Sequence, residues 1–344
     1  MMQVNWKQLE ELTQLRGISG QEDQVREYLI QKIQGRYESY VVDDMGNLLV
    51  HKKGKARPAR KVLFSAHMDE VGFVVTHIDE DGMLHFATVG GISPSVIPGR
   101  PVLVGPEAIP GVIGTRPVHL LTPEEREEYA KVEDMRIDIG AGSREKAQEM
   151  AAPGDMVTFI GPWRELGEDA VLARAIDDRA GCALLLEMIQ GELPWDCDFA
   201  FVVQEETGCA GSKAAAFSLR PEVAVVVEST TAGDLPTAPA GRQVCRVGKG
   251  PVISFMDKGT IYPRDLYEQV TSLARGAEIP WQAKEGVFGG NDARSYCSSA
   301  AGAKVAAVSL PVRYLHSPNT LASKRDMEDA RELLALLARE LPRG

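Results

Sequence analysis

Four short apolar runs constrain this chain more than any other feature of its sequence. Each run is rich in Val, Ala or Phe and is followed by residues able to bind a metal ion. The runs are 62–66 before His67, 199–203 before Glu205 and Glu206, 223–227 before Glu228, and 305–310 before His316. Continuous apolar strands are typical of a mainly parallel sheet covered on both faces. Because ligands of such sheets gather at the carboxyl ends of the strands, we expect these polar residues to meet at one rim.

The rest of the chain predicts two kinds of structure. Helical patterns lie between or beside the apolar runs, over 180–189, 266–274 and 327–341, so we expect an α/β fold whose mixed, mainly parallel sheet is flanked by helices. Residues 70–164 instead contain short strands separated by many Gly and Pro residues, which is typical of a small β barrel. We therefore predict a discontinuous catalytic domain over 1–69 and 165–344, interrupted by a β-rich domain over 70–164.

Two local patterns near the start of the chain are also predictive. Ser19 and Glu22 have the spacing of a capping box, which predicts a helix running to about Ile33. The strand-like segments 40–43 and 48–51 flank Met45-Gly46-Asn47, and this arrangement predicts a hairpin.

Charge and composition exclude several classes of function. The 38 basic and 49 acidic residues give a net charge of −11, which disfavours binding to nucleic acid. We interpret the basic stretch 51–61 as a solvated loop. No apolar run reaches the roughly 18 to 20 residues of a membrane helix, and the start of the chain lacks the pattern of a secretion signal. The five cysteines include no C-x-x-C pair, so we expect free thiols in a cytoplasmic protein that does not bind membranes.

His67 and Asp177 are the first candidates for metal binding. A metal-bound imidazole usually donates its other N–H to a carboxylate or carbonyl, so Asp69, two residues after His67, is expected to orient His67 or the neighbouring ligands. Asp177 and Asp178 precede a predicted helix, and one of them can cap it. A carboxylate can also bridge two metal ions, and Asp177 suits that role if other ligands converge on it.

The adjacent residues Glu205 and Glu206 directly follow an apolar strand. Burying both is costly unless they are paired or metal-bound, so we expect one to bind metal and the other to move a proton to and from water. The full set of candidate ligands is His67, Asp177, Glu206, Glu228 and His316. Two imidazoles and three carboxylates suit two divalent ions of zinc, cobalt or manganese in a hydrolase.

Six motifs in a fixed order carry a resemblance to a known family. They are AHMDEVG at 66–72, AIDDRAG at 175–181, QEETG at 204–208, AGD at 232–234, GGNDA at 289–293 and RYLHSP at 313–318. With these motifs the chain resembles the metallopeptidase family 42 aminopeptidases. That family includes glutamyl aminopeptidases and the tetrahedral, self-compartmentalising TET aminopeptidases, and some relatives carry endoglucanase labels.

The resemblance implies a role for each candidate. It implies two metal sites that share Asp177, namely His67, Asp177 and Glu228 for one ion and Asp177, Glu206 and His316 for the other. Glu205 would be the general base acting on a bridging water, and Asp69 would orient His67. The family fold is a zinc-peptidase-like α/β domain whose inserted barrel serves subunit association. Members commonly form dimers that assemble into homo-oligomeric dodecamers and admit short peptide substrates.

The sequence departs from the family pattern at two positions. Glu228 stands where many relatives have Asp, which changes reach and denticity at one metal. Asn291 replaces a common threonine in the glycine-rich loop. An acidic substrate preference would need a cation in the pocket, and the candidates are Arg242, Arg246, Lys258, Arg264 and Arg294.

Two other functions compete with the aminopeptidase. A deacylase or a glycan-directed hydrolase could use the same metals and base. A scaffold with a decayed site is disfavoured because all five candidate ligands and Glu205 are present.

Overall fold

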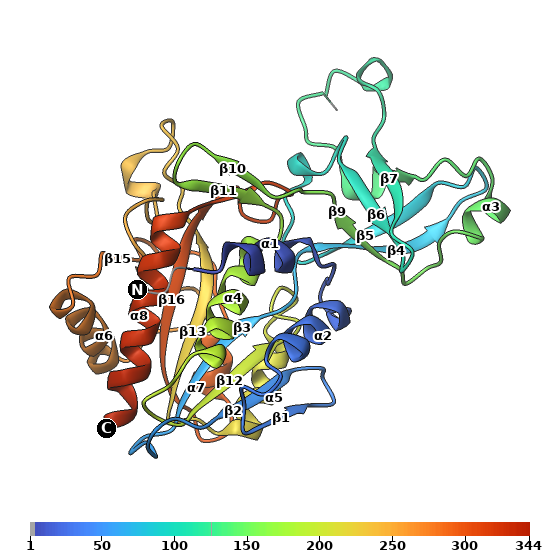
Figure 1. Ribbon diagram of the computed structural model, residues 1–344. Helices are drawn as coiled ribbons and strands as arrows, with labels where there is room; N and C mark the ends of the chain where they lie inside the picture. Colours follow the sequence, from blue (N-terminus) through green and yellow to red (C-terminus); the bar gives the residue numbers. More distant parts are fainter. Residues whose placement is uncertain (1–3, 125) are drawn as a thin grey trace.

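The computed structural model describes residues 4–124 and 126–344, which form an α/β body and a smaller β barrel projecting from it (Figure 1). The body contains an 11-stranded mixed sheet with the order β1-β2-β12-β3-β13-β16-β17-β11-β10, and β14 and β15 are attached beside β16. The predicted mixed sheet with an inserted barrel is therefore confirmed.

The centre of the sheet consists of parallel strands, and the outer strands pair antiparallel except for β14 with β15. The central strands are β12 (Cys197–Val202), β3 (Val62–His67), β13 (Val223–Thr231) and β16 (Lys304–Arg313). The outer strands are β1 (Ser39–Val42), β2 (Leu48–Lys52), β17 (Thr320–Ser323), β11 (Ala170–Ala173) and β10 (Arg164–Leu166), and the short pair is β14 (Val252–Ile253) and β15 (Gln282–Ala283). The four apolar runs are thus neighbours, and their carboxyl ends share one rim.

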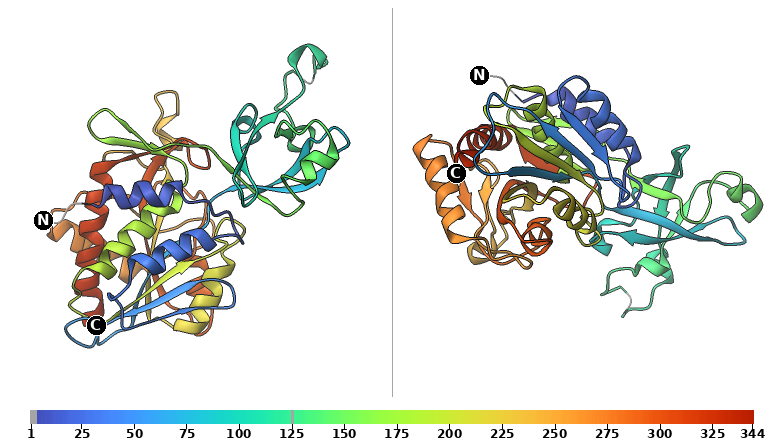
Figure 2. Two further views of the ribbon diagram at one scale, coloured as in Figure 1. Left: turned by 45° about the vertical axis from the view of Figure 1, so that its right-hand side comes forward. Right: turned by 90° about the horizontal axis from the view of Figure 1, so that it is seen from below.

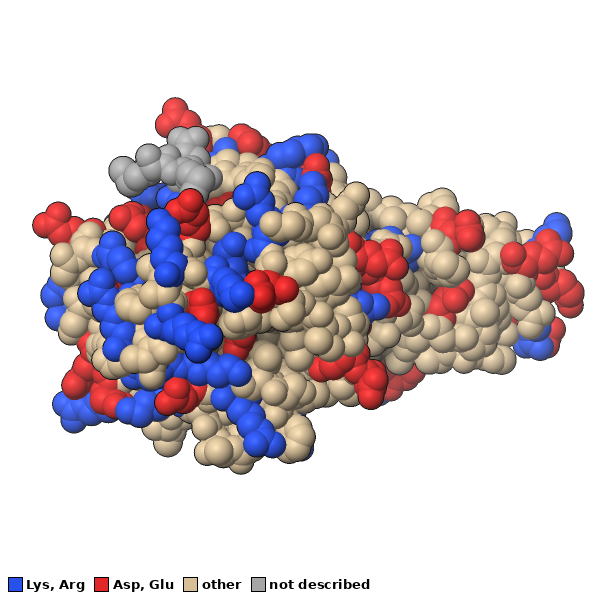
Figure 3. All heavy atoms as spheres, turned by 60° about the horizontal axis from the view of Figure 1, so that its bottom comes forward, with Lys and Arg blue, Asp and Glu red and all other residues tan. Residues whose placement is uncertain are grey.

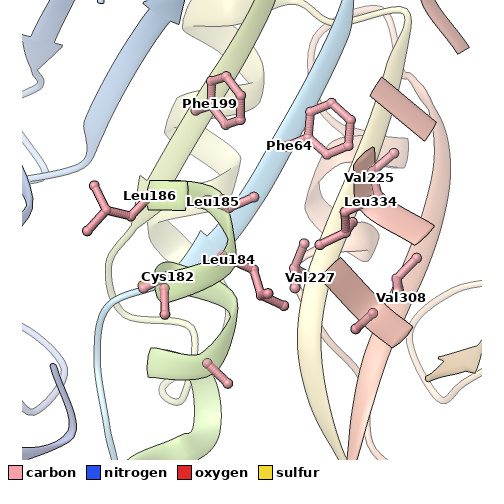
Figure 4. Packing of buried hydrophobic residues seen from close by; sticks show 14 of the residues in the cluster. Phe64, Cys182, Leu184, Leu185, Leu186, Phe199, Val225, Val227, Val308 and Leu334 are labelled. Carbon is pink, nitrogen blue, oxygen red and sulfur yellow. The ribbon is translucent and has the colours of Figure 1, made fainter. Parts of the chain in front are cut away.

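Helices cover both faces of the sheet, which explains why the central strands are apolar throughout. One face packs against α1 (Trp6–Gln14), α2 (Asp23–Lys32), α4 (Ile176–Gln190), α6 (Arg264–Gly276) and α8 (Lys324–Glu340). The other face packs against α5 (Ala210–Leu219) and α7 (Ala293–Ser298). Phe64 and Phe199 stack on the first face with ring centroids 5.8 Å apart, and they belong to the same buried cluster as Leu184 of α4 and Leu334 of α8 (Figure 4).

The barrel lies between β3 and β10 along the chain and has its own core. Its closed order is β4 (Gly72–Ile78), β5 (Leu84–Val89), β8 (Arg136–Asp138), β7 (Ile109–Gly114), β6 (Pro101–Val104) and β9 (Met156–Phe159), with α3 (Arg144–Gln148) beside it. The Phe73 ring makes edge-to-face contacts with Phe86 and Phe159, each with centroids 5.1 Å apart. Figure 2 shows the open ring of strands standing clear of the body. The described part of the chain also has 3-10 turns at Pro94–Val96, Val118–Leu120, Val132–Asp134, Ala240–Arg242 and Leu341–Arg343.

Two local expectations need correction. The predicted helix is present as α2, which begins at Asp23 and ends at Lys32, but its capping box is wrong. The Ser19 hydroxyl donates to Asp69 Oδ2 at 2.6 Å, and Glu22 Oε1 accepts from the backbone N–H groups of Gly20 at 2.7 Å and Gln204 at 3.1 Å. Tertiary partners have taken both side chains away from the helix. Glu228 does not end its strand either, since β13 pairs with β16 as far as Thr231. The predicted hairpin between β1 and β2 is confirmed.

The surface carries mixed charge where the sequence is most basic. Within the stretch 51–61, Lys53 pairs with Glu38 at 2.6 Å, Lys55 with Glu192 at 2.8 Å and Lys61 with Asp198 at 3.2 Å. Figure 3 shows lysine and arginine interspersed with acidic side chains over the α/β body. No helix among residues 4–124 and 126–344 has the length and apolar character needed to cross a membrane.

Candidate active site

The structure brings all five candidate ligands together at the carboxyl rim of the central strands. His67 is the last residue of β3, and Asp177 lies in the first turn of α4. Glu206 lies in the turn after β12, Glu228 within β13, and His316 three residues beyond β16. The side chains come from distant parts of the chain, and the outermost two, His67 and His316, are 249 positions apart. Their meeting is a consequence of the parallel strand order.

Asp177 lies between two imidazoles and faces each with a different oxygen. Its Oδ1 lies 3.4 Å from His67 Nε2, and its Oδ2 lies 3.4 Å from His316 Nε2. Each imidazole nitrogen has a second carboxylate close by. Glu228 Oε1 lies 3.3 Å from His67 Nε2, and Glu206 Oε1 lies 3.3 Å from His316 Nε2. The site therefore consists of two half-sites, each with one His and one Glu, that share an Asp.

Both imidazoles are held by a carbonyl behind them. His67 Nδ1 lies 3.0 Å from the backbone carbonyl of Asp69, and His316 Nδ1 lies 2.7 Å from that of Gly91. An N–H donated to these carbonyls leaves Nε2 as the free lone pair directed at the carboxylates. Gly91 follows β5, so the barrel segment contributes directly to the site. A backbone carbonyl has no sequence signature, which is why the motif analysis missed it.

The Asp69 side chain supports the glutamate turn. Its Oδ1 accepts the backbone N–H of Glu205 at 3.0 Å, and its Oδ2 accepts that of Glu206 at 3.1 Å and the hydroxyl of Ser19 at 2.6 Å. Its Oδ1 also lies 3.4 Å from His67 Nδ1. One buried carboxylate thus fixes the turn that presents two neighbouring glutamates and borders one imidazole.

Several buried carboxylate oxygens of the site lack hydrogen-bond donors among the described residues. They are Asp177 Oδ1, Glu206 Oε1 and Glu228 Oε2. A buried charge without a partner is costly, and here carboxylates outnumber imidazoles. The donor set of imidazole nitrogens and carboxylate oxygens matches borderline divalent ions such as zinc, cobalt and manganese. The orphaned oxygens therefore fit a metal centre.

The electrostatics of the site reflect this surplus of carboxylates. Burial disfavours charged imidazoles, but the carboxylates of Asp177 and Glu206 outweigh it and raise the pKa of His316 to about 11. The pKa of His67 is likewise raised, because Glu228, Asp177 and Asp69 outweigh the desolvation of its charged form. Burial raises the pKa of Glu228 to about 8, although His67 opposes the change. In the protein without metal, protons held by these histidines and by Glu228 thus partly compensate the negative charge of the carboxylates.

Asp178 differs from its neighbour Asp177 in what its oxygens do. One oxygen of Asp178 also lies within 4.8 Å of ligand atoms of His67 and Glu228. However, its Oδ2 accepts the backbone N–H of His67 at 3.3 Å and its Oδ1 accepts that of Gly181 at 3.0 Å. Asp178 therefore ties the start of α4 to β3, whereas Asp177 lines the pocket with an oxygen that accepts no hydrogen bond.

The loops that carry the site contain non-glycine residues with left-handed backbone. Their φ angles are 52° at Ala175, 55° at Gln204, 61° at Cys209, 60° at Tyr314 and 57° at His316. Such conformations cost energy and collect at functional sites, where the surrounding structure enforces them. Three of the site-bearing loops are therefore shaped by their tertiary contacts.

A pocket of about 360 Å³ opens onto the carboxylates, and Glu205 lies in its wall. Burial raises the pKa of Glu205, and the charge of Glu228 adds to this effect. Its Oε1 accepts from the Cys209 thiol at 3.4 Å. Among the described residues, Glu205 forms no ion pair with either imidazole, so it differs from Glu206 in facing the pocket without a histidine partner.

The residues that line the pocket also distinguish among the five basic residues considered from sequence as partners for an acidic substrate residue. Of those five, Arg294 lines the pocket, and the other four do not. Lys284, next to β15, lines it as well and was missed, because its sequence surroundings have no recognisable pattern. Lys284 is 5% exposed and has no carboxylate within ion-pair distance among the described residues. Its desolvation lowers its pKa, which Asp257 and Glu228 partly offset.

Comparison with known proteins agrees with this geometry. Residues 46–333 match the family model described as M42 glutamyl aminopeptidase. The chain belongs to the M42 peptidase family. It is thus a peptidase, a hydrolase of peptide bonds, and the predicted family resemblance is confirmed.

Individual relatives span nearly the whole chain. The lysyl aminopeptidase of Pyrococcus furiosus is 31% identical, with 98% of each chain covered. Among solved structures, the TET aminopeptidase of a marine sediment Thaumarchaeota archaeon is 33% identical with a TM-score of 0.93, covering 98% of this chain and 96% of its own. The Pyrococcus horikoshii TET1 peptidase, described as assembling into a tetrahedron or a large octahedral shell, is 36% identical with a TM-score of 0.86, covering 97% and 99%.

Proposed function

We propose that the chain is a two-metal aminopeptidase that removes N-terminal residues from short peptides. The observation that carries this proposal is Asp177, whose two oxygens each face a different imidazole at 3.4 Å. The first ion would be held by His67, Asp177 and Glu228, and the second by Asp177, Glu206 and His316. Bound divalent ions of zinc, cobalt or manganese would supply Lewis acidity toward the scissile carbonyl and toward water.

Glu205 is the general base in this proposal. It lies in the pocket wall beside the carboxylate centre, and the turn that carries it is fixed by Asp69. A raised pKa suits a carboxylate that takes a proton from the attacking water and then delivers it to the departing amine. The surplus of carboxylates around the pocket also suits the free α-ammonium group that distinguishes an N-terminal residue from an internal one.

A substrate panel tests this function. The metal-loaded protein should hydrolyse unblocked aminoacyl-anilides and should leave N-acylated anilides and oligoglucans intact. Glu205→Gln should lower kcat by at least about 100-fold while metal content stays unchanged. Cleavage of acylated amides or glycans in preference would favour the deacylase or glycan-hydrolase alternative. Full activity in Glu205→Gln would contradict the assignment of the base, and His67→Ala with undiminished metal would contradict the ligand set.

Lys284 points to substrates with an acidic N-terminal residue. A nearly buried ammonium in the pocket wall, without its own carboxylate, is suited to pair with a substrate carboxylate. We expect Lys284→Met to lower kcat/KM for glutamyl-anilide by about 30-fold or more, with little change for leucyl-anilide. Lys258→Met, which removes a lysine outside the pocket lining, is the matched control. Equal losses on both substrates would refute this role.

We also propose that the chain assembles with copies of itself, as dimers that build a dodecamer, through the barrel segment 70–164. The barrel stands clear of the α/β body in Figures 1 and 2. It exposes large apolar side chains, with Val118 66%, Leu120 62% and Tyr129 75% exposed. The likeness of the whole chain to the TET1 peptidase supports this assembly.

We also propose a cytoplasmic location. The five free cysteines are consistent with a reducing compartment.

A further inference from the structure

A second group of potential ligands lies beside the proposed metal pair and shares no histidine with it. It consists of Glu205, Cys209 and Asp292, each of which offers one ligand atom within 4.8 Å of the others. The Cys209 thiol lies 3.4 Å from Glu205 Oε1. Glu205 and Cys209 line the pocket, so an ion can reach the group from solvent.

Asp292 is the member that ordinary structural roles do not explain. It is 0% exposed, and neither of its carboxylate oxygens accepts a hydrogen bond among the described residues. It precedes α7 without capping that helix through its side chain. The hydroxyls of Ser212 and Ser295 donate to the carbonyl of Cys209, at 3.1 and 3.0 Å. Burial raises the pKa of Asp292 to about 6, and the nearby Ser212 hydroxyl and Cys209 thiol only partly offset that rise. A fully buried carboxylate with two unsatisfied oxygens is therefore directed at a thiol and a second carboxylate.

We propose that Glu205, Cys209 and Asp292 form a third metal site, which takes a thiophilic divalent cation such as Cd²⁺ or excess Zn²⁺. One sulfur and two oxygens form a softer donor set than the imidazole and carboxylate pair. Tetrahedral zinc with bonds of about 2.3 Å to sulfur and about 2.1 Å to oxygen places these ligands about 3.6 Å apart. Binding replaces the thiol proton, which leaves to solvent, by a metal–sulfur bond.

Occupation of this site would control the enzyme through Glu205. A cation bound to Glu205 stabilises the charged carboxylate and lowers its pKa, so the group takes a proton from water far less readily. This consequence rests on the proposed role of Glu205 as the base. Excess thiophilic metal is therefore an inhibitor, although the same class of ion is needed at the metal pair. The metal site itself does not depend on that role.

Cadmium titration of the zinc-loaded protein tests the site by a signal that is independent of activity. Only a sulfur ligand gives thiolate-to-cadmium charge-transfer absorption, so cadmium at the imidazole and carboxylate pair is silent. We expect wild type to gain this absorption with one extra ion by elemental analysis. Cys209→Ser should lack both, and Asp292→Asn should need at least 10-fold more cadmium. Cys297→Ser, which removes the most exposed of the five thiols, should behave as wild type.

Each other outcome overturns a defined part of the proposal. Absorption that persists in Cys209→Ser, or disappears in Cys297→Ser, places the cadmium elsewhere and refutes the site. The same holds if wild type binds no extra ion, or if Asp292→Asn binds as tightly as wild type. If the ion binds but peptidase activity does not fall, measured against each variant's own rate without cadmium, the site stands and its control of Glu205 is refuted. If the chain cleaves no peptide at all, the proposed function fails while absorption still decides the site.

Discussion

Two clusters of buried charge flank the end of β3, and they are built in opposite ways. The first surrounds Glu70, which is 4% exposed and pairs with Arg174 and Arg179. The second is the proposed metal centre around His67 and Asp177. In the first, the protein supplies its own cations, whereas in the second it supplies carboxylates in excess. The difference shows which buried cluster is complete within the chain and which requires a partner from outside.

The cluster of Glu70, Arg174 and Arg179 connects several segments of the fold. Arg179 donates to the carbonyls of Leu12 at 2.7 Å and Met68 at 2.8 Å, and Arg174 donates to that of Leu15 at 2.9 Å. The last carbonyls of a helix lack partners within the helix, so these guanidinium groups satisfy the end of α1. Nearby, Arg16 extends the network to the barrel through the carbonyl of Gly105, at 2.7 Å. Positive and negative groups are thus both saturated.

The proposed metal centre, by contrast, contains carboxylate oxygens without partners. Among the described residues, one oxygen each of Asp177, Glu206 and Glu228 accepts no hydrogen bond. Glu70 and His67 are only three positions apart. The segment at the end of β3 thus contributes one residue to a stabilising ion-pair cluster and another to the proposed catalytic site.

Matched Glu→Gln substitutions in the two clusters should give the largest difference in stability and therefore the clearest test of this comparison. Glu70→Gln leaves two buried guanidinium groups without their carboxylate and should lower the free energy of unfolding by about 3 to 5 kcal/mol. In metal-free protein, Glu228→Gln removes the cost of keeping this buried carboxyl group protonated at pH 7 and should raise the free energy of unfolding by about 1 to 3 kcal/mol. Urea unfolding at pH 7 in the presence of a chelator measures both values.

Adding metal provides the control for this pair. With zinc restored, Glu228→Gln should become destabilising relative to wild type, because a ligand is lost, whereas Glu70→Gln should be equally destabilising with and without zinc. If both substitutions destabilise the metal-free protein to the same extent, the distinction between the clusters is wrong.

The stability of the metal-free protein should also depend on pH, which is a smaller effect that tests the surplus of carboxylates in the second cluster. The pKa of Glu228 rises from 4.5 to about 8 on folding, and that of His316 rises from 6.5 to about 11. In both cases the folded state holds a proton that the unfolded state has lost. Stability should therefore fall as pH rises above 4.5, most steeply between 6.5 and 8, by up to about 1.4 kcal/mol per pH unit for each group.

Urea midpoints between pH 5 and 9 measure this slope. Zinc should abolish it, since metal binding needs the deprotonated ligands and grows stronger as pH rises. Glu228→Gln should reduce the slope below pH 8 in the metal-free protein. A metal-free stability that is flat or increasing over this range would contradict the proposed surplus of carboxylates.

Much of the fold was predictable because the relevant signals are local. The apolar runs before His67 and Glu205 specify buried parallel strands, and the glycine- and proline-rich segment 70–164 specifies short strands with many turns. The prediction failed where a side chain had a distant partner. Ser19 and Glu22 have the spacing of a helix cap, but Asp69 and Gln204 engage them instead.

The sequence by itself determined the chemistry available to this protein, and the tertiary structure decided its arrangement. Residue type, together with a position after an apolar run or before a predicted helix, was sufficient to nominate His67, Asp177 and Glu206. Distances between segments far apart in sequence depend on strand order and packing, so the carbonyl of Gly91, the place of Lys284 in the pocket wall and the approach of Asp292 to Cys209 emerged only in three dimensions. Burial is the physical reason, because it alone turns an ordinary carboxylate into one that needs a partner.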